Sequence, residues 1–255
     1  MSRPVALVLA APGTNRDRDV AFALDLAGAE PRITLLAEVI SEPSLLGQAQ
    51  MLVAAGGFSY ADALGAGRMW ALELEHRLGD ALAEFVAAAK PVIGICNGFQ
   101  VLTRAGLLPG ALGHNADGLF HCQWVTIAAE PASHCIWTAG LEQIDCPIAH
   151  GEGRYVHPDP AGLAAAGQVA LRYVQGDGGG SASAGRCDGA GNPNGSVADI
   201  AGVCDPTGLV LGLMPHPENH VIDRQHPSFS RHDGVDRARS GLPLFEQGVR
   251  YAKEH

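Results

Sequence analysis

The turn at residues 91–100 constrains this chain more than any other feature. An apolar run ends at Gly94-Ile95-Cys96-Asn97-Gly98, and a stretch compatible with a helix follows at once, up to Arg104. This pattern predicts a sharp strand-to-helix turn, the nucleophile-elbow arrangement, with a thiol in place of a hydroxyl. The N–H groups that open the helix would favour a thiolate at Cys96. The alternative is a buried structural cysteine, because free cysteines are usually buried.

Short apolar runs alternate with helical patterns through the first half of the chain. The runs are Val5–Ala11, Ile33–Leu36, Met51–Ala55 and Val92–Ile95, and the helical stretches are Asp17–Ala27 and about 66–89. This alternation predicts the α/β class, with a mostly parallel twisted sheet and helices on both faces. Such sheets bind ligands at the carboxyl ends of their strands, which is where Cys96 lies.

The second half of the chain is richer in strand patterns. The candidate strands are Trp124–Ala128, Ala170–Val174, Ile200–Val203 and Leu209–Leu213. Between two of them, residues 176–185 consist mostly of glycine, serine and alanine and predict a flexible loop, too short for a convincing domain linker. We therefore expect a single domain over residues 1–255.

Composition and charge exclude several functions. The formal net charge of -10 and the scattered Lys and Arg residues argue against a nucleic-acid or anionic-membrane surface. None of the 6 cysteines forms a C-x-x-C pair, so we expect no metal site and reduced thiols. The apolar run near the N-terminus is too short for a membrane span and lacks the pattern of a cleavage site. These features predict a cytoplasmic protein.

A thiol nucleophile needs a base, and the base needs a group that orients it. His216 and Glu218 follow the predicted strand Leu209–Leu213 in the segment Met-Pro-His-Pro-Glu. Because His216 precedes a proline, its backbone should be extended, and side chains two residues apart then point to the same side. The spacing predicts an imidazole braced by a carboxylate. A surface histidine in a proline-rich turn is the alternative.

An acyl-transfer site also needs donors for the developing oxyanion. The N–H of Asn97 is one expected donor, and Gly57 or Gly56, after a neighbouring strand, would supply the other. An ordinary turn at these glycines is the alternative. Gln100 lies one helical turn beyond Cys96, and its side chain should lean back toward the pocket and bind an amide. The alternative for Gln100 is a surface position.

These residues resemble the class I, or triad, glutamine amidotransferases. Five further segments resemble, within that class, the glutaminase subunits of phosphoribosylformylglycinamidine synthases, which act in de novo purine biosynthesis. They are residues 11–15 (APGTN), 56–60 (GGFSY), 149–154 (AHGEGR), 192–196 (NPNGS) and 214–218 (MPHPE). Two departures concern the site: Ala61 stands where this family usually has glycine, and Leu119 where it usually has arginine.

The resemblance implies a reaction, a set of site residues and partners. Cys96, His216 and Glu218 would form the triad, and Asn115 and Phe120 would lie in a stretch that meets the glutamine substrate. Ammonia would pass to a large synthase subunit that converts formylglycinamide ribonucleotide to formylglycinamidine ribonucleotide, with a small third subunit bridging the two. No cofactor is expected on this chain, because no phosphate-binding loop pattern is present and ATP and Mg should bind the synthase. A stand-alone thiol hydrolase and a non-catalytic glutamine sensor are the rival interpretations.

Overall fold

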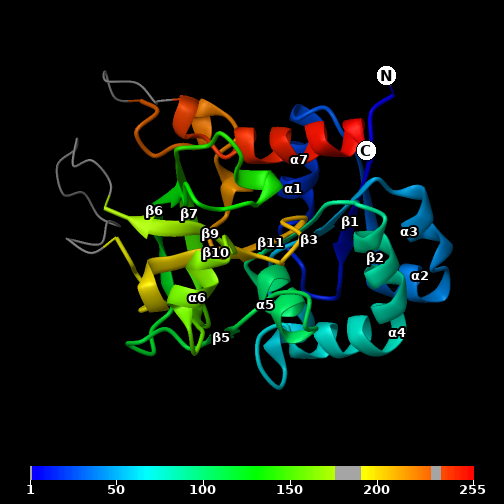
Figure 1. Ribbon diagram of the computed structural model, residues 1–255, viewed down its shortest axis with the longest axis horizontal. Helices are drawn as coiled ribbons and strands as arrows, with labels where there is room; N and C mark the ends of the chain where they lie inside the picture. Colours follow the sequence, from blue (N-terminus) through cyan, green and yellow to red (C-terminus); the bar gives the residue numbers. More distant parts are fainter. Residues whose placement is uncertain (1, 176–190, 231–236) are drawn as a thin grey trace.

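The protein is described by a computed structural model that covers residues 2–175, 191–230 and 237–255 (Figure 1). Its main feature is a nine-stranded sheet with the order β2-β1-β3-β4-β11-β10-β9-β6-β7. The expected loop at 176–185 lies outside the described residues. None of the helices in the described ranges has the length and apolar character that a membrane span requires.

The first half of the sheet is parallel, as the alternating pattern predicts. Its strands are β1 (Val5–Ala10), β2 (Glu30–Leu35), β3 (Met51–Ala54), β4 (Val92–Ile95) and β11 (Val210–Leu213). The register pairs Ile95 at the end of β4 with Leu213 at the end of β11. The segments that follow these two strands, which carry Cys96 and His216, therefore leave the sheet side by side.

The second half of the sheet is antiparallel, so the sheet as a whole is mixed. Its strands are β10 (Ile200–Cys204), β9 (Val169–Val174), β6 (His121–Ala129) and β7 (Gln143–His150). A separate two-stranded ribbon joins β5 (Ala111–Gly113) to β8 (Arg154–Val156). The α/β class is confirmed, and the strands predicted in this half are present, whereas β7 was not predicted.

Helices cover both faces of the parallel half. Helix α1 (Asp17–Leu26) packs beside α7 (Leu242–Glu254) on one face, and α4 (Arg68–Ala87) packs beside α5 (Asn97–Arg104) on the other (Figure 1). The buried stripe of α4 contains the predicted apolar residues: Trp70, Leu74, Leu78, Leu82 and Phe85. Shorter helices complete the fold: α2 (Leu36–Ser41), α3 (Ser44–Gln48) and α6 (Pro160–Ala165).

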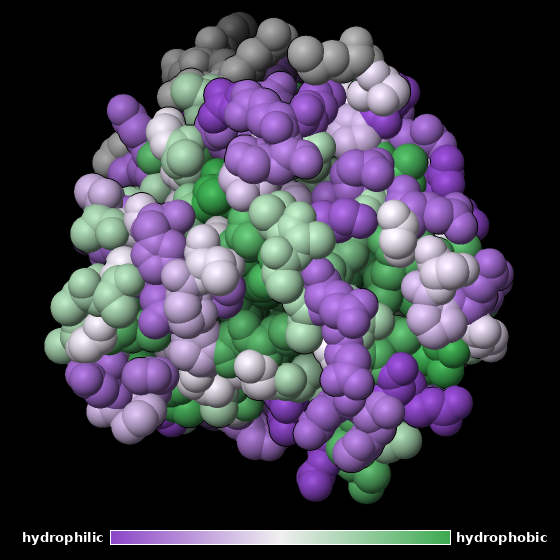
Figure 2. All heavy atoms as spheres, turned by 45° about the vertical axis from the view of Figure 1, so that its right-hand side comes forward, coloured by the Kyte–Doolittle hydropathy of each residue, from purple (hydrophilic) through white to green (hydrophobic). Residues whose placement is uncertain are grey.

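The core lies between these helices and the sheet. Strands β3 and β4 are buried along their whole length, as expected for central strands covered on both faces. Hydrophilic residues cover much of the face shown in Figure 2, with hydrophobic residues exposed between them.

Candidate active site

Cys96 occupies the predicted elbow between β4 and α5. Its backbone has φ 52° and ψ -105°, a conformation that is costly for a residue other than glycine and that often marks functional sites. The flanking glycines are required by close packing. A Cβ atom on Gly98 would lie 1.9 Å from the carbonyl oxygen of Ala54, and one on Gly94 would lie 2.6 Å from the Leu102 side chain. Only glycine at these positions lets helix α5 approach the sheet and hold the thiol in place.

His216 and Glu218 meet as the prolines predict. Nδ1 of His216 lies 2.7 Å from Oε1 of Glu218, and both side chains are almost fully buried. The backbone of His216 is outside the helical region, with φ -107° and ψ 81°, and Glu218 follows in the single 3-10 turn η4 (Pro217–Asn219). The N–H of His216 donates to the carbonyl oxygen of Pro147 on β7 over 2.8 Å. This bond ties the imidazole segment to the antiparallel half of the sheet.

The electrostatics of His216 favour its cationic form. Burial alone would lower the pKa of the imidazole, but the charge of Glu218 and the hydrogen-bonded thiolate of Cys96 outweigh it and raise the pKa to about 10. Near pH 7 the imidazole of His216 is therefore protonated and lies beside the Cys96 side chain. A thiolate is the nucleophilic form of cysteine, and an imidazolium is able to protonate a leaving amine.

Hydrogen bonds to the carbonyl oxygen of Gly56 fix the orientation of the Gly56–Gly57 peptide. The carbonyl oxygen of Gly56 accepts hydrogen bonds from the N–H groups of Asn15 and Arg16 at 3.3 and 3.2 Å. In a trans peptide the next N–H points the opposite way, so the N–H of Gly57, which lines the same cavity as Cys96, faces away from these donors. A Cβ atom on Gly56 would lie 2.9 Å from Cε1 of His216. Gly56 therefore allows close packing of the base, and Gly57 is placed to supply the donor.

Asn97 and Gln100 form a connected pair at the start of helix α5. The backbone N–H of Asn97 belongs to the first turn of the helix, whose N–H groups have no partner within the helix. Its side chain accepts from the N–H of Ser59 at 3.2 Å and donates to Oε1 of Gln100 at 2.9 Å. Nε2 of Gln100 donates to the carbonyl oxygen of Glu152 at 2.6 Å. Gln100 thus lines the cavity, but its side-chain amide is already hydrogen-bonded to Asn97 and to the backbone of Glu152.

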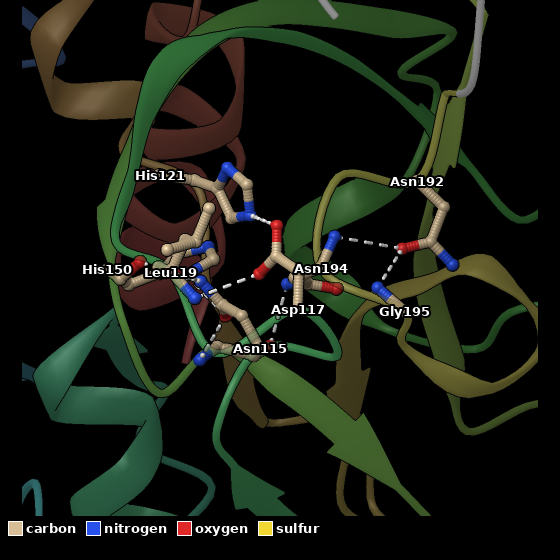
Figure 3. Close-up of polar contacts among 9 residues, drawn as sticks. Asn115, Asp117, Leu119, His121, His150, Asn192, Asn194 and Gly195 are labelled. Carbon is tan, nitrogen blue, oxygen red and sulfur yellow. Dashed lines mark hydrogen bonds and ion pairs between the residues drawn. The ribbon is translucent and has the colours of Figure 1, made fainter.

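Asn115 lies behind the cavity wall, where protein groups occupy its side chain (Figure 3). Its amide nitrogen donates to the carbonyl oxygens of Leu119 and His150 at 2.7 and 2.9 Å. Its oxygen accepts from the N–H of Gly153 and from Nδ1 of His150, both at 3.1 Å. Asn115 therefore holds His150 and Gly153 in place by hydrogen bonds, next to the residues that line the cavity.

The loop after Asn115 is held by its own ion pair. Nε2 of His121 lies 2.9 Å from Oδ2 of Asp117, and Oδ1 of Asp117 accepts the N–H of Leu119 at 3.0 Å (Figure 3). These interactions lower the pKa of Asp117, the Leu119 N–H contributing most. Leu119, where the related sequences usually carry arginine, is 63% exposed and lies outside the cavity lining.

Segment 192–196 supports the same wall from the other side. Asn194 is buried, and its amide nitrogen donates to the carbonyl oxygen of Gly153 at 2.8 Å. Oδ1 of Asn192 accepts from the N–H of Gly195 at 3.0 Å and folds the segment into a tight turn (Figure 3). The segment therefore fixes the backbone that carries the cavity wall.

A cavity of about 290 Å³ opens beside Cys96. Phe120, predicted to meet the substrate, lines it together with Phe58, and the two rings stack with their centroids 6.3 Å apart. Sequence reasoning did not assign Asp62, His114 or Glu152 to the site, although all three line the cavity. Glu152 lies within the segment 149–154 singled out in the sequence, and Asp62 lies two residues after the segment 56–60. Only the folded loops bring both residues to the cavity that Cys96 lines.

Cys96 and Gly57 line one cavity, and the buried His216–Glu218 pair lies beside the thiol, an arrangement typical of cysteine amidases of the triad type. In agreement, residues 3–252 match the family described as the CobB/CobQ-like glutamine amidotransferase domain. Two relatives are named phosphoribosylformylglycinamidine synthase subunit PurQ. The one from Treponema denticola is 45% identical, covering 98% of this chain and 99% of the relative. The one from Dehalococcoides mccartyi is 36% identical over the full length of both chains.

Solved structures agree with the sequence relatives. A chain of the PurLQS structure from Thermotoga maritima has a TM-score of 0.75 and 34% identity, covering 98% of this chain and 99% of that chain. A glutamine amidotransferase from the same organism has a TM-score of 0.54 at 13% identity and shares the fold. This chain belongs to the PurQ family of glutamine amidotransferases.

Proposed function

We propose that this chain hydrolyses L-glutamine to glutamate and ammonia and supplies the ammonia to a partner synthase. That synthase converts formylglycinamide ribonucleotide to formylglycinamidine ribonucleotide in de novo purine biosynthesis. The observation that carries the proposal is the buried His216–Glu218 pair beside Cys96, on a chain of the PurQ family. A cationic imidazole next to a cysteine nucleophile is suited to cleaving an amide.

The mechanism follows from the positions of these groups. The thiolate of Cys96 attacks the γ-amide carbon of glutamine, and the oxyanion that forms accepts from the N–H groups of Gly57 and Asn97. His216, held by Glu218, gives its proton to the nitrogen, so the C–N bond breaks and ammonia leaves. His216 then takes a proton from water, which attacks the thioester. The C–S bond breaks, glutamate forms, and the thiolate and imidazolium are restored.

The partners and cofactors belong to the same proposal. The PurLQS structure supports assembly of this chain with a large synthase subunit and a small bridging subunit. None of the proposed steps needs a metal ion or an organic cofactor on this chain, and ATP and Mg would act on the synthase. We place the assembly in the cytoplasm, in keeping with the acidic composition of the chain and with the free cysteines in the part of it that the structure describes.

Isotope transfer tests this function in the assembled complex. With glutamine labelled with ¹⁵N at the amide, and unlabelled ammonium in the medium, the label should appear in the formylglycinamidine product. The Cys96→Ala complex is the matched control and should give unlabelled product only. Label that appears only as free ammonium, with unlabelled product, would contradict the delivery of ammonia to the synthase.

A further inference from the structure

The cavity beside Cys96 carries two carboxylates whose role the mechanism leaves open. Asp62 and Glu152 both line it, and its lining within the described residues includes no lysine or arginine. Both carboxylates thus share one small cavity, and burial and then the charge of Glu152 raise the pKa of Asp62. The cavity is therefore short of positive charge before a substrate enters.

Asp62 has an acceptor to spare. Its Oδ1 atom is buried and has no hydrogen-bond partner among the residues that the structure describes. Its backbone lies in the left-handed region with φ 53°, as do Tyr60 and Ala61 before it. The hydroxyl of Tyr60 donates to Glu73 on helix α4 and anchors this strained turn. Strain of this kind persists where the surrounding structure holds it, and it commonly marks ligand-binding positions.

Glu152 is held at the cavity by its backbone, and its side chain is incompletely neutralised. Its carbonyl oxygen accepts from Gln100, as described above. Its Oε2 atom lies 3.9 Å from the guanidinium of Arg104, a distance too long for a hydrogen bond. The side chain of Glu152 is 22% exposed and so remains available to a ligand.

His150 adds a further acceptor to the same wall. It is 2% exposed and lines the cavity, and burial lowers its pKa to about 3, so the ring is neutral. Because both hydrogens of the Asn115 amide go to carbonyl oxygens, the Asn115 oxygen must accept, and Nδ1 of His150 must carry the proton. Nε2 is then a bare acceptor, buried and without a partner among the described residues.

We propose that Asp62 and Glu152 form the seat for the α-ammonium group of the glutamine substrate and set the selectivity of the enzyme for α-amino amides. An ammonium group has three N–H donors and no acceptor, which complements a wall of acceptors. It would relieve the repulsion between the two carboxylates when it binds. A substrate that has the side-chain amide but lacks the α-amino group would leave these acceptors unpaired, and an unpaired buried acceptor disfavours binding. The seat rests on the proposed glutaminase function.

Two substrates that differ only in the amino group test the seat. We would measure kcat/KM of the assembled complex for glutamine and for its desamino analogue, 4-carbamoylbutanoate, by release of glutamate or glutarate. The wild-type complex should prefer glutamine by about 10²-fold or more. Asp62→Asn should reduce this preference at least about tenfold, mainly by raising KM for glutamine, with activity on the analogue nearly unchanged. Glu152→Gln should act in the same direction.

Asp80→Asn, an exposed change of the same kind on helix α4, is the matched control and should keep the wild-type preference. Variants at Asp62 and Glu152 that lose activity on both amides equally would show a structural role and overturn the seat. A wild-type complex that hydrolyses the analogue as well as glutamine would also overturn it. A wild-type complex that hydrolyses neither would contradict the glutaminase function itself.

Discussion

Nδ1 of His216 lies 2.7 Å from a Glu218 oxygen, and the second oxygen of that carboxylate is buried with no partner among the described residues. The carboxylate thus directs its charge at the imidazole, whose pKa it helps to raise to about 10. A buried anion that interacts mainly with one cation fixes both the orientation and the charge of its partner.

Glu218→Gln should preserve the fold and lower glutaminase turnover by about 10²-fold or more. The amide keeps the shape of the carboxylate but loses the negative charge that stabilises the imidazolium. Steady-state glutamate release by the assembled complex measures this loss, and circular dichroism checks the fold. Turnover at the wild-type level would mean that another group orients His216.

His150 should make the protein sensitive to acid. Its pKa is lowered to about 3 by burial and then by the charges of His216 and His121, whereas an unfolded histidine titrates near about 6.5. Between these values the unfolded chain binds more protons, so the free energy of unfolding falls as the pH drops from about 6.5 toward 3. This effect amounts to roughly 2 kcal/mol at about pH 5.

The test compares the wild type with His150→Gln, which does not titrate. Urea denaturation at about pH 7 and about pH 5 should show a smaller loss of unfolding free energy in the variant. Identical losses in both proteins would show that His150 is not buried as a neutral ring.

Ala61→Gly should stabilise the protein. Ala61 has φ 53°, which costs roughly 1–2 kcal/mol for a residue with a Cβ atom, while glycine adds roughly 0.4–1 kcal/mol of unfolded-chain entropy. The expected net gain is about 1 kcal/mol in the free energy of unfolding, measured by urea denaturation. Ala81→Gly, in the middle of helix α4, is the opposite control and should destabilise. A loss of stability in Ala61→Gly would show that residue 61 does not adopt the left-handed conformation.

Free of its partners, the chain should hydrolyse glutamine slowly. Uncoupled hydrolysis would release ammonia without synthesis, and the sequence has no ATP-binding motif with which to sense the synthase reaction. We expect contact with the synthase to act on the Gly56–Gly57 peptide. A flip of this peptide would remove an oxyanion donor and raise the activation barrier for glutamine hydrolysis by about a few kcal/mol. Glutamate release should therefore rise when the nucleotide-bound complex assembles. Equal rates in the isolated and the assembled protein would indicate a constitutive glutaminase.

The elbow and the His216–Glu218 pair could be predicted because local rules determine them. The glycines around Cys96 and the proline after His216 restrict the backbone within a few residues. Strand β7 was missed for a related reason: Pro147 lies inside it, and proline argues against a strand unless the strand is at an edge. In the structure β7 is the last strand of the sheet, where this proline is tolerated.

The carboxylates of the cavity could not be predicted from local patterns. Asp62 lines the cavity at the end of a turn in which three successive residues adopt left-handed conformations, which no local pattern in Tyr60-Ala61-Asp62 requires. Glu152 reaches the same cavity from the end of β7, on the antiparallel half of the sheet. Both positions depend on how distant parts of the chain pack, and hydrophobic periodicity does not encode this.

The thiol of this chain produces ammonia and the synthase consumes it, so replacement of the thiol separates the two activities. In the complex assembled with Cys96→Ala, we would measure formylglycinamidine ribonucleotide synthesis with glutamine and then with ammonium as the nitrogen source. We expect the glutamine-dependent rate to be lost and the ammonium-dependent rate to stay at the wild-type level, because only ammonia production needs the thiol. Glutamine-dependent synthesis that survives the substitution, or loss of both rates in a complex that assembles normally, would contradict this expectation.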